Sequence, residues 1–332
     1  MLKIGLVGVG HLGKIHLKCI KEAKNLELVG CFDINMESAD AAAAQFNTVA
    51  FADLSDLLEE IDILDIVTPT ITHFELAKQA IIKGKHVFIE KPLTHTLSEA
   101  EELVELCRQN QVQVQVGHVE RFNPAFISID QDQLNPRFVE AHRLATFNPR
   151  GTDVSVVLDL MIHDLDILLS LVNSEVKLVQ ASGVAVVSET PDICNARIEF
   201  QNGCVANLTA SRISMKQMRK MRFFQKDAYI SLDFLEKKSE IIRLYESNNP
   251  DRPSEEGMTL DTNTGKKHIH FESPTIEPIN AIKEELSSFA NAIENKTLPT
   301  VSIYDGYKVL KLAHQIIKEI EKRGYVLEKE NY

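Results

Sequence analysis

The sequence predicts an α/β protein of two domains: an N-terminal doubly wound parallel sheet, and a C-terminal α+β domain with a large, mainly antiparallel open sheet. Two observations carry this prediction. The first ~120 residues alternate apolar runs with helical segments. From about residue 176 to residue 234, apolar and polar residues instead alternate with a period of two. The 332 residues suit two domains, and we expect them to be residues 1–122 and 123–332.

The first domain is predicted from strands and helices in alternation. Strands are expected over residues 3–7, 26–32, 63–67, 86–89 and 112–116, and helices over residues 11–24, 36–46, 71–83 and 97–110. Gly84 is expected to cap the helix that precedes it. A helix between consecutive strands allows those strands to be parallel, and six strands with such crossovers would complete the doubly wound sheet.

The second domain begins where this alternation ends, near residue 123. An apolar helix is expected over residues 157–172, and two closing helices over 278–294 and 304–323. The alternating segment between them contains turn signals at residues 201–203 and 226–227, which are typical of antiparallel pairing. The polar residues 247–265 are interpreted as a surface excursion.

Composition excludes several classes of function. The 36 Lys and Arg face 48 Asp and Glu, and a net charge of −12 would repel a nucleic acid or an anionic membrane. No apolar run approaches the ~20 residues of a membrane span. Five cysteines without a C-x-x-C pair indicate free thiols in the cytoplasm. We expect no metal site, and we interpret His268 and His270 as exposed strand residues.

A glycine-rich turn at residues 8–13 is the first candidate site. Gly8-Val9-Gly10-His11-Leu12-Gly13 fits G-x-G-x-x-G between an expected strand and an expected helix. Gly8 permits a tight turn, Gly10 lets a pyrophosphate approach the backbone, and Gly13 lets helix and strand pack closely. Because the helix N-terminus offers amide donors to phosphates, the pattern predicts a Rossmann dinucleotide site.

Asp33 ends the second expected strand and stands 20 residues after Gly13. An acid at this position hydrogen-bonds the ribose 2′-hydroxyl of NAD. No arginine follows it to accept the 2′-phosphate of NADP, so the sequence favours NAD. The alternative is that Asp33 only caps the next helix.

Lys91 lies in Glu90-Lys91-Pro92, at the end of another expected strand. Open parallel sheets bind ligands at the carboxyl ends of their strands, so a lysine there would point toward the nicotinamide and could take part in proton transfer. The alternative is a surface lysine in a loop.

Asp159 and His163 are four residues apart and share one face of an otherwise apolar helix. A carboxylate one turn from an imidazole can fix its tautomer and raise its basicity. The alternatives are a buried core histidine, or a histidine paired with Asp164 instead.

These motifs together resemble the Gfo/Idh/MocA family of oxidoreductases. The resemblance rests on the glycine turn, Glu90-Lys91-Pro92, the helix with Asp159, His163 and Asp166, and residues 301–306. It implies a Rossmann domain followed by a domain with an open sheet that often mediates oligomerisation. It also implies that Lys91, Asp159 and His163 form the catalytic set. The residues expected to bind the cofactor are Gly8, Gly10, His11, Leu12, Gly13, Asp33, Thr68, Pro69, His73, Glu90 and Lys91.

A finer resemblance is to members of this family that oxidise UDP-N-acetyl-sugars. It rests on residues 116–124, on residues 143–153 and on the basic residues 216–222, although Asn148-Pro149-Arg150 stands where Gly-Pro-Arg is expected. In an acidic protein, Arg121, Arg143, Arg150 and residues 216–222 could hold a diphosphate, or the basic strand could be a solvated edge. The residues expected to bind substrate are Lys91, Arg121, Asn123, Arg150, Asp159 and His163.

We therefore expect a cytoplasmic, NAD-dependent dehydrogenase that oxidises a ring hydroxyl of a sugar, namely C3 of a UDP-N-acetyl-sugar. His163 would act as the base and Lys91 as the donor to the same oxygen, or these roles would be exchanged. Alternatives are a dehydrogenase of a neutral polyol or free sugar such as an inositol, and a non-catalytic NAD-binding sensor. A homodimer or homotetramer is expected through a sheet face that includes Val205, Leu208, Ile213 and Met215.

Overall fold

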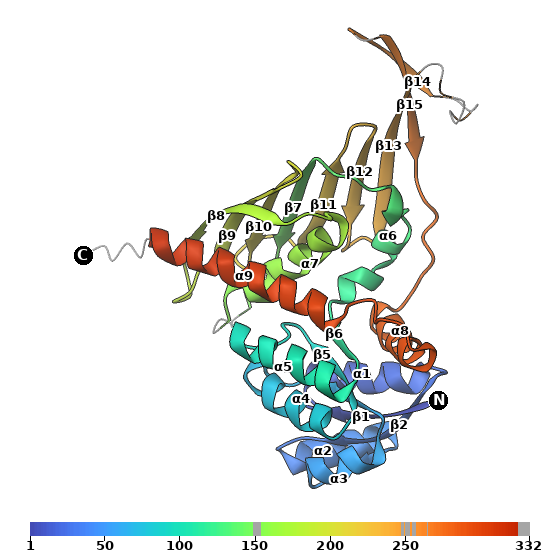
Figure 1. The fold of residues 1–332 in the computed structure, drawn as a ribbon, viewed down its shortest axis with the longest axis vertical. Helices are drawn as coiled ribbons and strands as arrows, with labels where there is room; N and C mark the ends of the chain where they lie inside the picture. The colour runs from blue at the N-terminus through green and yellow to red at the C-terminus, as the bar shows by residue number, and fades with distance from the viewer. Residues whose placement is uncertain (149–153, 247–248, 250–252, 254–256, 264, 325–332) are drawn as a thin grey trace. The chain divides into compact units, whose positions relative to one another are not determined.

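The chain forms two compact units (Figure 1). The computed structural model describes residues 1–148, 154–246, 249, 253, 257–263 and 265–324. The first unit is Met1–Phe122 with Ile279–Lys311, and the second is Asn123–Pro278 with the chain from Leu312. The sequence also placed a boundary after residue 122, but it assigned residues 279–311 to the second domain rather than to the first unit.

The first unit contains a six-stranded parallel sheet. Its strands are β1 (Leu2–Val7), β2 (Leu26–Phe32), β3 (Val49–Ala50), β4 (Ile63–Ile66), β5 (His86–Glu90) and β6 (Val114–Gly117), in the order β3-β2-β1-β4-β5-β6. This order confirms the doubly wound fold. The strand order reverses between β1 and β4, and sheets of this kind bind ligands at that reversal, outside the carboxyl ends of the strands.

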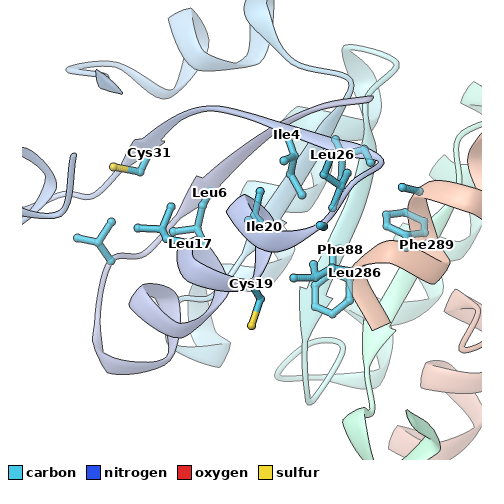
Figure 2. Packing of buried hydrophobic residues seen from close by; sticks show 14 of the residues in the cluster. Ile4, Leu6, Leu17, Cys19, Ile20, Leu26, Cys31, Phe88, Leu286 and Phe289 are labelled. Atoms are coloured by element: carbon cyan, nitrogen blue, oxygen red, sulfur yellow. The ribbon is translucent and has the colours of Figure 1, made fainter. Parts of the chain in front are cut away.

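Helices complete the first unit. They are α1 (His11–Glu22), α2 (Met36–Phe46), α3 (Leu54–Glu60), α4 (His73–Ile82), α5 (Leu97–Asn110) and α8 (Ala281–Asn295), with 3-10 turns η1 (Thr70–Thr72) and η2 (Val119–Phe122). The short helix α3 is absent from the sequence prediction. Figure 2 shows Leu17 and Ile20 of α1 in the same core as Phe88, Leu286 and Phe289. Residues from both ends of the chain therefore build this core.

The second unit contains a nine-stranded sheet. Its strands are β7 (Phe138–Leu144), β8 (Val176–Val184), β9 (Ile193–Phe200), β10 (Val205–Ser211), β11 (Met218–Phe224), β12 (Ala228–Asp233), β13 (Lys238–Glu246), β14 (Met258–Thr262) and β15 (Gly265–Glu272). The order is β14-β15-β13-β12-β11-β7-β10-β9-β8, and only the pair of β7 and β10 is parallel. The mainly antiparallel sheet is thus confirmed. Part of the supposed excursion over residues 247–265 is strand β14 at the sheet edge.

The helical elements of this unit are α6 (Pro124–Ile127), η3 (Gln131–Gln133), the π-helix η4 (Val157–Met161), α7 (Ile162–Leu171) and the end of α9 (Ile303–Arg323).

Side chains on the strands of the second unit alternate between a buried face and a more exposed face. Leu208 of β10 lies on the buried face, so the expectation that it belongs to an open face is wrong. Val205 is half-buried, whereas Met215 is 96% exposed.

Within the described ranges, no helix is both long enough and apolar enough to cross a membrane.

Candidate active site

The glycine turn between β1 and α1 can accept only glycine at two positions. Gly8 has a φ of +95°, and a Cβ there would lie 2.5 Å from the carbonyl oxygen of Val67. A Cβ on Gly13 would lie 1.9 Å from the carbonyl oxygen of Gly8. Gly10 differs, because a Cβ there would meet nothing within 4 Å. The space next to Gly10 is therefore open, as the backbone of a pyrophosphate site requires.

The N-terminus of α1 faces this space with its backbone donors. Gly10 is the N-cap residue, no side chain caps the helix, and its first turn contains no acidic residue. A hollow of about 550 Å³ adjoins the turn, lined by Val9, Gly10, His11, Lys14, Glu37, Ser38 and Ala41. Backbone donors and the helix dipole both favour an anion there, so the turn fits a dinucleotide diphosphate.

Asp33 is tied to the glycine turn. Its Oδ2 accepts the backbone N–H of Val9 at 2.9 Å, and its Oδ1 accepts that of Asn35 at 2.9 Å. The residue that caps α2 is Asn35, whose side chain accepts the N–H of Ser38 at 3.0 Å. Asp33 is therefore not the helix cap. Each of its carboxylate oxygens retains a lone pair for a ribose hydroxyl.

His73 links two of the loops at the carboxyl edge of the sheet. Its Nδ1 lies 2.9 Å from the carbonyl oxygen of Pro92, and its Nε2 lies 2.9 Å from that of Thr68. Burial lowers the pKa of His73, although the two carbonyl groups oppose this. Both ring nitrogens thus face backbone carbonyl groups, and the contact of His73 with the cofactor stays a prediction. His73 holds the Thr68-Pro69 segment next to the loop of Lys91.

Lys91 follows the last residue of β5, where the sequence placed it, and its peptide bond to Pro92 is cis. Behind it lies a group of buried charges that the sequence analysis missed. His16 of α1 contacts Asp65 of β4 at 2.9 Å and Glu90 of β5 at 3.2 Å. A signal was present, because Asp65 interrupts the apolar run Ile63-Leu64-Asp65-Ile66.

The other predicted catalytic residues belong to the second unit. Asp159 lies in η4 and His163 in the first turn of α7, and both are half-buried. A small cavity of about 110 Å³ is lined by Arg143, Leu144, Ala145, Leu160, His163, Gln217 and Arg219. His163 therefore faces a space with a basic wall. The π-helix fits this position, since such turns occur frequently at functional sites.

Arg143 has a different role from the predicted one. It lies on β7 with only 3% of its surface exposed, and its guanidinium donates to both carboxylate oxygens of Asp164 at 2.9–3.1 Å. The interpretation of Arg143 as a diphosphate ligand is therefore replaced by a buried ion pair. This pair fixes α7 on the sheet.

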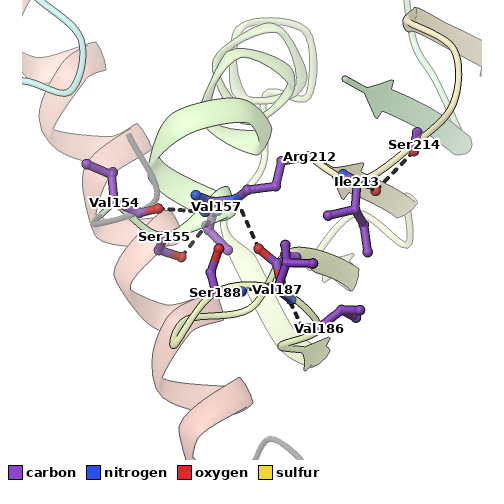
Figure 3. Close-up of polar contacts among 11 residues, drawn as sticks. Val154, Ser155, Val157, Val186, Val187, Ser188, Arg212, Ile213 and Ser214 are labelled. Atoms are coloured by element: carbon purple, nitrogen blue, oxygen red, sulfur yellow. Dashed lines mark hydrogen bonds and ion pairs between the residues drawn. The ribbon is translucent and has the colours of Figure 1, made fainter. Parts of the chain in front are cut away.

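A second buried pair fixes the start of η4. Arg212 donates to the carbonyl oxygen of Val154 at 2.6 Å, and its Nε lies 3.8 Å from Asp192 (Figure 3). Asp192 in turn accepts the backbone N–H groups of Val186, Val187 and Ser188 at 2.7–3.0 Å. These donors lower the pKa of Asp192 although burial opposes them. The chain that leads to Asp159 is thus anchored by Arg212, which directly follows β10.

The remaining substrate candidates differ in position. Arg121 is half-buried in η2, and Arg150 lies outside the described residues. Asn123 caps α6 by accepting the N–H of Ala125, and it donates to the carbonyl oxygen of Phe234 at 3.0 Å. These bonds give Asn123 a structural role, and its contact with substrate stays a prediction.

The basic strand β11 uses part of its charge within the sheet. Lys220 pairs with Asp233 at 3.2 Å, and Arg222 lies 3.5 Å from Glu140. Arg219 of the same strand lines the cavity of His163. In the part of the chain that the structure describes, no group of three His, Cys, Asp or Glu residues is suited to a metal ion.

Comparison with known proteins agrees with both halves of the chain. Residues 2–118 match the model of the oxidoreductase family with an NAD-binding Rossmann fold, and residues 127–230 match the GFO/IDH/MocA C-terminal domain. The UDP-N-acetylglucosamine 3-dehydrogenase of Acidithiobacillus ferrooxidans is 36% identical over 321 residues, which are 96% of this chain and 97% of that protein. Its solved structure aligns over 97% of this chain and 98% of its own with a TM-score of 0.87.

Inositol dehydrogenases are more distant relatives. The myo-inositol 2-dehydrogenase of Thermotoga maritima is 23% identical over 98% of both chains. Levoglucosan dehydrogenase in complex with NADH and L-sorbose is 20% identical with a TM-score of 0.82 over 97% of both chains, which shows a shared fold.

Proposed function

Because the chain belongs to the Gfo/Idh/MocA family of oxidoreductases, we propose that it is an NAD-dependent dehydrogenase that oxidises C3 of UDP-N-acetylglucosamine to the 3-keto sugar. The observation that carries this proposal is the 36% identity, over nearly the whole of both chains, to a UDP-N-acetylglucosamine 3-dehydrogenase. Inositol dehydrogenases match less closely, at 23–30% identity.

The choice of NAD rests on the residues around the glycine turn. Asp33 and Glu37 place two carboxylates near the hollow next to Gly10, and both would repel a 2′-phosphate. Gly8, Gly10, Gly13, Asp33 and the N-terminus of α1 would hold the dinucleotide. When bound, its nicotinamide supplies the hydride acceptor.

The residues of this chain supply orientation and proton transfer. The C3–H bond breaks as a hydride leaves, and the hydroxyl proton is taken by His163, which Asp159 orients. Lys91 donates a hydrogen bond to the same oxygen and stabilises its developing charge. The five cysteines are buried free thiols, which suits action in the cytoplasm.

The diphosphate of the substrate is assigned to arginines outside the buried pairs. With Arg143 committed to Asp164, the candidates are Arg121, Arg150 and Arg219. Bidentate contacts from arginine to phosphate are strong and geometrically specific. Association of subunits into a dimer or tetramer through the second sheet remains part of this proposal.

NADH formation with UDP-N-acetylglucosamine, free N-acetylglucosamine and myo-inositol, measured side by side, tests the function. Arg121→Ala should weaken binding of the UDP-sugar by about 1.5–3 kcal/mol, the cost of a lost charged hydrogen bond. Arg108→Ala is the matched control, because Arg108 is exposed and pairs with Glu105 in its own helix. Equal efficiency with the free sugar or with inositol would leave a dehydrogenase of neutral polyols, and absence of NADH with every sugar would leave a sensor.

A further inference from the structure

A buried ion pair in the second unit lies beside the chain that leads into η4. Arg212 directly follows β10, and Asp192 directly precedes β9; both side chains are buried. Arg212 Nε lies 3.8 Å from Asp192 Oδ1, and the backbone N–H of Arg212 donates to the carbonyl oxygen of Asp192 at 2.9 Å. Taking two charges out of water costs free energy, so further contacts must offset this cost.

Asp192 is fixed by the turn that precedes β9. Its Oδ2 accepts the backbone N–H groups of Val186, Val187 and Ser188 at 2.7–3.0 Å. Burial opposes ionisation of this carboxyl group, but these donors hold the pKa of Asp192 below its usual value. The carboxylate is therefore an anion with a fixed position, and Arg212 is held against it.

Arg212 extends this anchor to the chain before η4. Its Nη2 donates to the carbonyl oxygen of Val154 at 2.6 Å (Figure 3). The next residue, Ser155, makes two bonds to the start of the helix. Its Oγ accepts the backbone N–H of Val157 at 3.3 Å, and its carbonyl oxygen accepts that of Asp159 at 2.9 Å. A continuous path of contacts thus leads from the buried ion pair to the backbone of Asp159.

The start of η4 depends on this path because the helix has no cap of its own. Its N-cap residue is Val156, which makes no side-chain cap bond, so the first N–H groups need other partners. Ser155 supplies two of them, and the bond from Arg212 to Val154 sets where Ser155 lies. A shift of this start by one residue would rotate the Asp159 side chain by roughly a quarter of a turn about the helix axis.

We propose that Arg212, held by Asp192, is a positioning residue that sets where η4 begins and thereby the direction of the Asp159 side chain. The inference rests on the proposed function only where it takes Asp159 to orient His163. Arg212 is not among the described residues that line the cavity of His163, so it acts through the backbone rather than by contact with substrate. The alternative is that the ion pair only joins β9 to β10.

Hydrogen exchange tests the anchor without any substrate. In Arg212→Ala, the backbone amides of residues 157–163 should exchange about tenfold faster, because the start of η4 loses its tie to Asp192. The amides in the middle of β9 and β10, at residues 196–199 and 206–209, should keep the exchange rates of the wild type. A rise of less than about twofold over residues 157–163 would overturn the inference. An equal rise in β9 and β10 would also overturn it, since the pair would then support the sheet alone.

Three further variants make this test specific. Arg212→Lys keeps the cation but offers one amine for two contacts, so its exchange should lie between those of wild type and Arg212→Ala. Arg197→Ala is the matched control, because Arg197 lies on β9 and contacts Glu199 at 3.3 Å with both side chains partly exposed. It should leave residues 157–163 unchanged, and an equal rise there would contradict the inference. Should Arg212→Ala fail to fold, Arg212→Lys and Ser155→Ala decide, and both should raise exchange over residues 157–163 by more than about twofold.

Turnover connects the anchor to the reaction. With UDP-N-acetylglucosamine, Arg212→Ala should lower kcat by about tenfold or more, while KM and the affinity for NAD change less than about twofold, because only the direction of Asp159 is altered. In an Asp159→Asn background the same change should have little further effect, because residues that act as one unit are not additive. A full additional loss in that background would contradict the inference. Failure of the wild type to form NADH with any sugar would contradict the proposed function alone, while the exchange result would stand.

Discussion

Both units bury charged side chains, but they do so in different ways. In the second unit, Arg143 and Asp164 form a buried ion pair through three hydrogen bonds of 2.9–3.1 Å. In the first unit, His16 serves two carboxylates, and one of them borders Lys91. The Arg143–Asp164 pair matches one cation with one anion, whereas His16 lies between two carboxyl groups.

The difference separates charges that support the fold from charges that serve a site. A buried pair whose hydrogen bonds are satisfied contributes order, and removal of one member leaves the other uncompensated. A buried group with an excess charge acts on whatever lies next to it, and such groups cluster at active sites. Arg143 was expected to bind substrate because its positive charge is visible in the sequence, whereas its pairing with Asp164 becomes visible only in the fold.

The largest effect is expected on stability in the second unit. Asp164→Ala would leave the Arg143 guanidinium buried without its anion, so the free energy of unfolding should fall by about 3–5 kcal/mol. Denaturation in urea measures it. Arg222→Ala on the neighbouring strand is the control, because its contact with Glu140 is half-exposed and should be worth less than about 1 kcal/mol. Equal losses from both variants would remove the distinction between buried and exposed pairs.

The next effect is expected on turnover. Lys91→Ala and His163→Ala should each lower kcat by about 10²-fold or more, which is the scale of general acid–base catalysis. His163→Ala should leave the affinity for NAD nearly unchanged, because the glycine turn lies in the first unit. Steady-state kinetics and a NAD titration measure both quantities. Near-normal kcat in both variants would show that neither residue is catalytic.

A smaller effect is expected on the choice of cofactor. Wild type should bind NAD more tightly than NADP. Asp33→Ala should reduce the ratio of the two affinities by about tenfold, because the repulsion of a 2′-phosphate is removed. Ile34→Ala, next to it but 97% exposed and apolar, is the control. Preference of the wild type for NADP would contradict the role of Asp33.

The smallest effect is expected on the pH dependence of stability. The folded-state pKa of His16 is raised, so its contribution is full below about pH 6.5, its unfolded value, and is lost as pH rises through the folded value. The difference in free energy of unfolding between wild type and His16→Gln should therefore shrink, by about 1 kcal/mol or more, from about pH 6 toward alkaline pH. A difference that grows with pH would mean that the imidazole is neutral in the folded protein.

Much of the first unit could be predicted because its signals are local. The helices over residues 36–46 and 97–110 were predicted with their observed bounds, and each begins at a capping side chain, Asn35 and Thr96. Strands β8 to β12 were predicted only as one alternating segment, His268 and His270 were expected to lie on a strand, and β7, β13 and β14 were not predicted. Strand β7 pairs in parallel with β10, which follows much later in the sequence. No tight turn joins the two strands, so the sequence contains no local signal for this pairing.

In the candidate site too, residues within local motifs could be predicted, and contacts between distant residues could not. The glycine turn and Lys91 are visible because they lie within short motifs at strand ends. His16 and Asp65 are 49 residues apart, and only the fold brings them together. A histidine in the apolar face of α1 is unusual when taken by itself, and so is an aspartate inside a buried strand. Their explanation requires the contact between them.

The core of the first unit determines when, during synthesis of the chain, this unit can finish folding. Leu286 and Phe289 of α8 belong to the same cluster as Ile4 and Leu6, and Asn25 donates to the carbonyl oxygen of Ser287 at 2.8 Å (Figure 2). On the ribosome, the N-terminal strands therefore emerge long before the residues that finish their core. The dinucleotide domain cannot be completed until almost the entire chain has been synthesised, and a gene cut after residue 122 would encode an unfinished domain.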